Sequence, residues 1–313
     1  MSAKPDVFLA LFNMVWPPDA PEPIRLPMTI TGTEVREAIQ HRNRNLPEGE
    51  KVLGAGNPAN FLKDFIRKRT CNENWPRRLK ALRYTARQRY GNELVFEFVP
   101  YRDGDDQPFP DRYDPVPDMP VHTIETLSMK RVAKALGRED EPWLTQIIVN
   151  QRIAHTHLAI YSPLNVVDFD HLQMSVKTQP EIDALFLATI SDDAGNDSRV
   201  LMTCEAKQFK ERILEDQIRE QVQKAFGFTE TLEELYRIDA VLPTAVQVIQ
   251  YDVAGVMKRG IYMVEFELVR RDEFLAQHAG DNLYRMPLNL ASRAFYLLEP
   301  PVVGISSSRR ANR

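Results

Sequence analysis

The sequence predicts an α/β protein in which a mixed sheet flanked by helices follows a mainly helical N-terminal domain. Three observations predict this architecture. The N-terminal part carries several helix-start signals but only one segment of alternating apolar and polar residues, at 93–101. A segment rich in proline and aspartate then interrupts the chain at 100–120. Beyond it, segments with strand-like and helix-like apolar spacing follow one another, as expected for a sheet covered by helices.

The helix-start signals of the N-terminal part lie at three places. Thr33 can cap one helix, Asn57-Pro58 places a capping residue before a first-turn proline, and Asn74 can cap a third helix. Helices followed by the strand at 93–101 suit a winged-helix-like module. The same order occurs in many other domains that mix helices and strands, so both interpretations stay open.

The segment 100–120 marks the expected domain boundary. It contains six prolines and six aspartates. Proline cannot continue a helix or an inner strand, so this segment is expected to be a linker or a long surface loop. We therefore expect an N-terminal domain at 1–120 and a second domain at 121–313.

Composition narrows the class of protein. The 313 residues are 43% hydrophobic and 27% charged, as in an ordinary globular protein. Only two cysteines are present, Cys71 and Cys204, which excludes a disulfide framework and a zinc site and fits a reducing cytoplasm. No apolar run approaches the roughly 20 residues of a transmembrane helix. We expect a cytoplasmic protein with no membrane partner and no signal peptide.

Basic residues are concentrated in one segment. Between residues 57 and 90, ten lysine and arginine side chains face two acidic ones, a local charge of +8 in a chain of net charge −4. Such a block predicts a phosphate-contacting face for nucleic acid, although a solvated helical surface would have the same composition. The side chains expected to contact DNA are Lys63, Arg67, Arg77, Arg78, Lys80, Arg83 and Arg87.

The second domain is expected to contain two helices and five strands. One helix starts at Pro142 and continues to His155. The strands are predicted at 172–175, 183–190, 200–207, 245–251 and 261–269, with the second helix at about 210–226. His155 and His157 are expected to have structural roles, since two rings at that spacing diverge on a helix.

A hairpin brings three ionisable residues together. The turn-forming residues at 191–198 lie between two of the predicted strands. Folding about Ala194 places Asp183 opposite Glu205 at the open end, within the one or two residues that a bulge can shift. Lys207 is two residues beyond Glu205, so both side chains leave the same face of the strand. Cys204 points to the opposite face and is not expected to be a catalytic thiol.

Phosphodiester hydrolysis requires this combination of groups. Asp183 and Glu205 offer hard oxygen atoms for Mg²⁺, and the nearby ammonium is expected to lower the pKa values of both carboxyls. Lys207 can orient or deprotonate the attacking water. Glu205-Ala206-Lys207 is the only acidic-x-lysine triplet in the chain. The alternative is an exposed ion pair on an edge strand.

This pattern resembles the PD-(D/E)XK nuclease superfamily, and within it the type II restriction endonucleases, over about residues 142–269. The resemblance implies a restriction-endonuclease-like core in which Asp183, Glu205 and Lys207 are catalytic and the two acids bind metal. The family's Pro-Asp pair is present here as Pro180-Glu181-Ile182-Asp183, so either acid could be the ligand. We prefer Asp183, with Glu181 as an auxiliary acid.

The helix after the lysine strand adds two further candidates. Gln217 and Gln221 lie one turn apart there and could reach the site as auxiliary residues, or could form a polar helix face. The resemblance implies a Mg²⁺-dependent type II restriction endonuclease that cuts double-stranded DNA at a short specific site. A homodimer is expected because a two-fold symmetric DNA site is recognised by a two-fold symmetric protein. The alternatives are a repair or recombination nuclease of the same superfamily and a non-catalytic DNA-binding protein.

Overall fold

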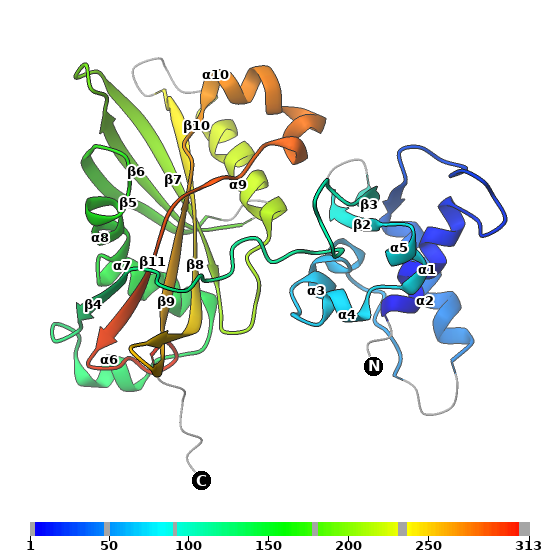
Figure 1. Cartoon of the computed structure of the whole chain (residues 1–313), viewed down its shortest axis with the longest axis horizontal. Helices are drawn as coiled ribbons and strands as arrows, with labels where there is room; N and C mark the ends of the chain where they lie inside the picture. Colours follow the sequence, from blue (N-terminus) through cyan, green and yellow to red (C-terminus); the bar gives the residue numbers. More distant parts are fainter. Residues whose placement is uncertain (1–3, 47–50, 90–92, 177–180, 231–236, 307–313) are drawn as a thin grey trace, which may run out of the picture. The chain divides into compact units, whose positions relative to one another are not determined.

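The structure is a computed structural model that describes residues 4–46, 51–89, 93–176, 181–230 and 237–306. The chain forms two compact units, Met1–Arg112 and Tyr113–Arg313 (Figure 1). The division falls inside the proline- and aspartate-rich segment 100–120. In the part of the chain that is described, no helix is both long and apolar enough to cross a lipid bilayer.

The first unit mixes helices with a three-stranded antiparallel sheet of order β1-β3-β2. A cluster of buried aromatic side chains, including Phe8, Phe65, Trp75 and Phe96, forms its core. Its elements are α1 (Lys4–Val15), β1 (Thr29–Thr31), α2 (Gly32–Arg44), η1 (Pro58–Asn60), α3 (Lys63–Ile66), α4 (Cys71–Asn74), α5 (Arg77–Ala81), β2 (Tyr84–Gln88) and β3 (Leu94–Pro100).

Several expectations for this unit were wrong in detail. Thr31, not Thr33, caps α2, because only Thr31 has a glutamate three residues later. The Glu34 N–H donates to Thr31 Oγ1 at 3.2 Å, and the Glu34 carboxylate accepts from the Thr31 N–H at 2.7 Å. The helix expected from Asn74 begins only at Arg77, since a residue before proline favours an extended backbone and Trp75 adopts one. The unit also contains strands β1 and β2 and helix α1, which the sequence did not indicate.

The second unit is built around a curled mixed sheet of order β4-β11-β9-β8-β7-β6-β5, with β10 beside β8 (Figure 1). The predicted α/β class, a mixed sheet flanked by helices, is confirmed. The pairs β7–β8 and β11–β4 are parallel, and the other pairs are antiparallel. The strands are β4 (Val121–Glu125), β5 (Val166–Val176), β6 (Ile182–Ser191), β7 (Asp197–Lys207), β8 (Ala240–Val253), β9 (Val256–Phe266), β10 (Val269–Arg270) and β11 (Leu290–Glu299).

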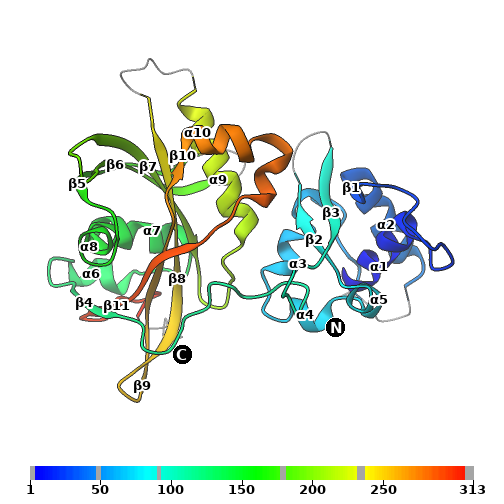
Figure 2. The same ribbon diagram turned by 45° about the horizontal axis from the view of Figure 1, so that its top comes forward.

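Helices cover both faces of this sheet (Figure 2). Trp143, Leu144 and Ile148 of α7 pack with Phe186 and other side chains of one face. On the other face, Ile218, Val222 and Phe226 of α9 pack against the strands. The helical segments are α6 (Arg131–Ala135), α7 (Glu141–Asn150), α8 (Ile153–Ile160), α9 (Glu215–Phe228), α10 (Arg271–Glu273), η3 (Phe274–His278) and η4 (Gly280–Arg285).

The helix expected from Pro142 to His155 is in fact two helices. Arg152 adopts a left-handed backbone with φ of 52°, which ends the run of α7 before α8 begins. His157 of α8 is fully buried and contacts Tyr296 Oη at 2.9 Å and Ser292 Oγ at 2.8 Å. His157 therefore supports packing, as predicted.

The β6–β7 hairpin has the predicted register. Ala184 pairs with Cys204 at one end and Ser191 with Asp197 at the other, which centres the turn on Ala194. Asp192 stabilises the turn, since its carboxylate accepts from the N–H groups of Ala194 and Asn196 at 2.9 and 2.8 Å. Asp183, directly before Ala184, therefore lies at the open end beside Glu205.

Candidate active site

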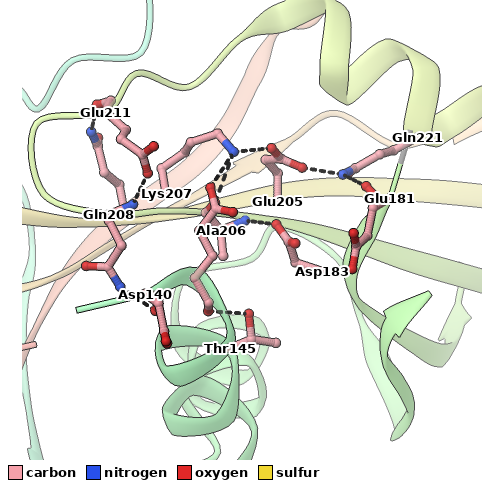
Figure 3. A network of polar contacts seen from close by, with 12 residues as sticks. Asp140, Thr145, Glu181, Asp183, Glu205, Ala206, Lys207, Gln208, Glu211 and Gln221 are labelled. Atoms are coloured by element: carbon pink, nitrogen blue, oxygen red, sulfur yellow. Dashed lines mark hydrogen bonds and ion pairs between the residues drawn. The ribbon is translucent and has the colours of Figure 1, made fainter. Parts of the chain in front are cut away.

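The three predicted catalytic residues converge at the open end of the β6–β7 hairpin (Figure 3). Asp183 belongs to the start of β6, whereas Glu205 and Lys207 belong to the end of β7. Glu205 and Lys207 are 2% and 1% exposed, so this is not the exposed surface ion pair considered as the alternative. The group is a buried network of charges.

Lys207 is the centre of this network. Its ammonium donates to the Glu205 carboxylate, to Glu141 Oε1 at 3.1 Å and to the Ala206 carbonyl oxygen at 3.1 Å. Burial alone would lower the pKa of Lys207, but the charges of Glu205, Glu141 and Asp183 outweigh it and raise that pKa. Lys207 therefore stays protonated at neutral pH and acts as a hydrogen-bond donor.

Glu141 was not predicted from the sequence. It is the first residue of α7, and the Asp140 side chain caps this helix by accepting from the Trp143 N–H at 2.9 Å. Acidic residues are common in a first helical turn because they face the positive end of the helix dipole. Because this local role explains Glu141 on its own, the sequence gives no sign of its contact with Lys207, 66 residues further along the chain.

Gln221 connects α9 to the same network. Its side chain is fully buried, and its amide Nε2 donates to the Glu205 carboxylate and to the Glu181 carbonyl oxygen at 3.1 Å. Gln217, one turn earlier, is also buried. The Oε1 atoms of both glutamines have no hydrogen-bond partner in the described part of the chain. Of the two auxiliary glutamines expected, Gln221 is the one that contacts a catalytic candidate.

Asp183 is the preferred partner of Glu205 on geometric grounds. Its Oδ2 accepts from the Ala206 N–H at 2.8 Å, whereas Glu181 is exposed and joins the network through its backbone carbonyl. Burial, followed by the charge of Glu205, raises the pKa of Asp183 to about 7, against the opposing effect of Lys207. Lys207 lowers this pKa, as expected, but burial and the charge of Glu205 outweigh it, so the expectation that the pKa of Asp183 would be lowered overall is wrong.

The donor set fits a hard divalent cation in charge and in chemistry. Asp183, Glu205 and Glu141 contribute three carboxyls against the single ammonium of Lys207, and carboxylate oxygen is the ligand that Mg²⁺ prefers. A divalent cation would offset the charge of Glu205, which together with burial raises the pKa of Asp183. Among the described residues, no three His, Cys, Asp or Glu side chains are already arranged to hold a metal ion.

The basic residues of the first unit do not form one helical surface. Arg78 lies over the Phe12 ring, 5.3 Å from its centroid, and Arg87 lies on β2, where it pairs with Glu97. These two arginines therefore have structural contacts.

The other expected DNA contacts differ in exposure. Lys80 donates to the Glu73 carbonyl oxygen at 3.0 Å and Arg83 to that of Asp105 at 2.6 Å. Lys63 and Arg67 are half-buried, whereas Arg77 is exposed. Arg77 and Arg83 are thus the most accessible members of the predicted set.

Cys204 is not a nucleophile in this arrangement. Its thiol is buried in the core on the opposite face of β7 from Glu205, and burial raises its pKa to about 12. A thiol with that pKa is not ionised at neutral pH, in agreement with the sequence-based expectation.

Comparison with known proteins gives no further guide to function. No family model, no curated protein and no solved structure matches the chain.

Proposed function

We propose that this protein is a Mg²⁺-dependent endonuclease of the PD-(D/E)XK type, which cuts double-stranded DNA at a short site like a type II restriction endonuclease. The observation that carries the proposal is the convergence of Asp183, Glu205 and Lys207 at one end of the β6–β7 hairpin. The helices on both sides of the mixed sheet and the parallel β7–β8 pair are compatible with a restriction-endonuclease-like core.

The proposed roles follow from the geometry. Asp183 and Glu205 would hold Mg²⁺, which supplies Lewis-acid polarisation of the scissile phosphate and a more acidic bound water. Lys207, kept protonated by its carboxylate neighbours, orients the water and offsets the negative charge that develops on the phosphate. Glu141 restrains the ammonium from the side of α7.

The first unit is proposed to read the DNA. One helix, a short strand, further helices and a hairpin, with sheet order β1-β3-β2, suit a winged-helix-like module. Its exposed Arg77 and Arg83 are the best placed of the expected DNA contacts. We further propose a homodimer, because a two-fold symmetric site is read by a two-fold symmetric protein.

A digest of phage DNA tests the function directly. The wild-type protein with Mg²⁺ should give discrete bands on a gel, EDTA should stop the reaction, and added Mg²⁺ should restore it. Asp183→Ala, Glu205→Ala and Lys207→Ala should each abolish cleavage and keep most DNA binding. Asp197→Ala, at the exposed closed end of the same hairpin, is the matched control and should cut normally. Full cleavage after exhaustive chelation contradicts the mechanism.

One observation favours a different class of protein. Glu205 and Lys207 are almost fully buried, as in a network that only stabilises a fold. A non-catalytic DNA-binding protein would bind DNA and leave it uncut in Mg²⁺. A repair or recombination nuclease of the same superfamily would spare plain linear duplex and cut branched or damaged substrates, so the choice of substrate separates it from a restriction enzyme.

A further inference from the structure

A tight turn follows the proposed catalytic lysine without any intervening residue. The Glu211 N–H donates to the Gln208 carbonyl oxygen at 3.0 Å, and the Glu211 carboxylate accepts from the Gln208 N–H at 2.8 Å (Figure 3). Lys210, at the third position of this turn, has a φ of 74°. Glycine is favoured at that position because a side chain strains a left-handed backbone.

The surrounding structure holds the turn in this strained conformation. The Gln208 side-chain amide donates to the Asp140 carbonyl oxygen at 2.6 Å, which ties the turn to the start of α7. The Gln247 side-chain amide, on β8, donates to the Glu211 carbonyl oxygen. A non-glycine residue persists in a left-handed conformation only where its neighbours determine it in this way, and such positions concentrate at functional sites.

The side chain of Lys210 differs from the nearby basic side chains in its ion pairs. Arg138 pairs with Asp140 at 3.0 Å and Arg259 with Glu139 at 3.5 Å, while Lys207 is held inside the carboxyl network. Lys210 is exposed, and its ammonium lies 5.6 Å from the centroid of the Phe209 ring. Within the described part of the chain it forms no ion pair.

We propose that Lys210 binds a phosphate of the DNA backbone next to the bond that is cut, an inference that rests on the nuclease function proposed above. Glycine would fit this backbone conformation with less strain, whereas lysine places an exposed ammonium there. An exposed ammonium is a point charge suited to a phosphate oxygen. Lys207 is held by Glu205 and Glu141 and is proposed to act at the scissile phosphate, whereas Lys210, exposed and without an ion pair among the described residues, can contact a neighbouring phosphate.

The test compares Lys210→Gly with two matched controls in the full-length protein. Ala254→Gly relieves a left-handed residue (φ of 54°) in the β8–β9 turn without a change of charge. Lys224→Ala removes an exposed lysine of α9 without relieving strain. Binding of a labelled duplex is measured in Ca²⁺ over a range of salt concentrations, and urea unfolding of each variant is measured in parallel.

Lys210→Gly is expected to unfold at higher urea concentration than wild type and yet to bind DNA more weakly. Loss of one phosphate contact should flatten the slope of log affinity against log salt by about 0.9, which is roughly an eightfold loss at 0.1 M salt. Lys210→Arg and Lys224→Ala should keep the wild-type slope, and Ala254→Gly should gain stability only.

Two results would overturn the proposal in distinguishable ways. If wild type cuts DNA and Lys210→Gly binds with the wild-type salt slope, Lys210 does not contact phosphate and the nuclease function stands. If the wild-type protein neither binds nor cuts DNA, the proposed nuclease function and the proposed contact of Lys210 with phosphate both fail. The wild-type protein alone gives this result.

Discussion

The raised pKa of Asp183 predicts an unusual dependence of stability on pH. A carboxyl whose pKa is higher in the folded state stabilises the fold below its unfolded pKa, and that stabilisation is lost as pH rises through the folded pKa. For Asp183 these values are 3.8 and about 7. At about 1.4 kcal/mol per pKa unit, integration between pH 5 and pH 8 gives a loss of roughly 3 kcal/mol in the absence of a divalent cation.

Asp183→Asn isolates this effect, because the amide keeps an oxygen for the Ala206 N–H but cannot ionise. Urea unfolding in EDTA should show that the variant gains roughly 3 kcal/mol over wild type when the pH is raised from 5 to 8. The difference between the two proteins cancels the titration of shared groups that do not interact with Asp183. Mg²⁺ at pH 8 should stabilise wild type and have little effect on the variant. Equal pH dependence of the two proteins would refute the raised pKa assigned to the Asp183 carboxyl.

Two further predictions concern the neighbours of the site and the first unit. Gln221→Leu should weaken Mg²⁺ binding, measured by calorimetry without DNA, by roughly 10- to 100-fold, because Glu205 loses the amide that orients it, whereas Gln223→Leu on the exposed face of α9 should have no effect. Arg77→Ala should flatten the salt dependence of DNA affinity by about one unit and leave stability unchanged. Arg78→Ala should instead lower the melting temperature of the protein, since Arg78 packs on Phe12. Equal effects of the two arginine variants would contradict this division of roles.

The hairpin was predictable because its signals are local. Turn-forming residues at 191–198 separate two apolar strands, and the two-residue period of a strand fixes which side chains share a face. Asp183, Glu205 and Lys207 could therefore be brought together by arithmetic on residue numbers. The place of Gln221 near the site was predictable in part. A helix that follows β7 must cross back over the sheet before β8 can run parallel to β7.

The features that the sequence did not indicate depend on contacts between distant segments. Glu141 looks like an ordinary first-turn acid until α7 is packed against β7. The strand β2 was hidden because its arginines were counted as a helical surface, although Arg87 and Glu97 face each other across the β2–β3 pair. The pKa of Asp183 depends on burial, which no pattern of neighbouring residues reports.

The hydrogen bonds of Glu205 bear on how the proposed site would accept a divalent cation. One carboxylate oxygen of Glu205 accepts from Lys207 and the other from Gln221. Lys207 has a second carboxylate partner in Glu141, and Asp183 has the Ala206 N–H. If Glu205 turned, Lys207 would keep its contact with Glu141 and Asp183 would keep its contact with the Ala206 N–H. Glu205 would then exchange the Lys207 ammonium for the divalent cation. We propose that a divalent ion would enter by a turn of the Glu205 side chain, and that its charge would favour the ionised form of the Asp183 carboxyl.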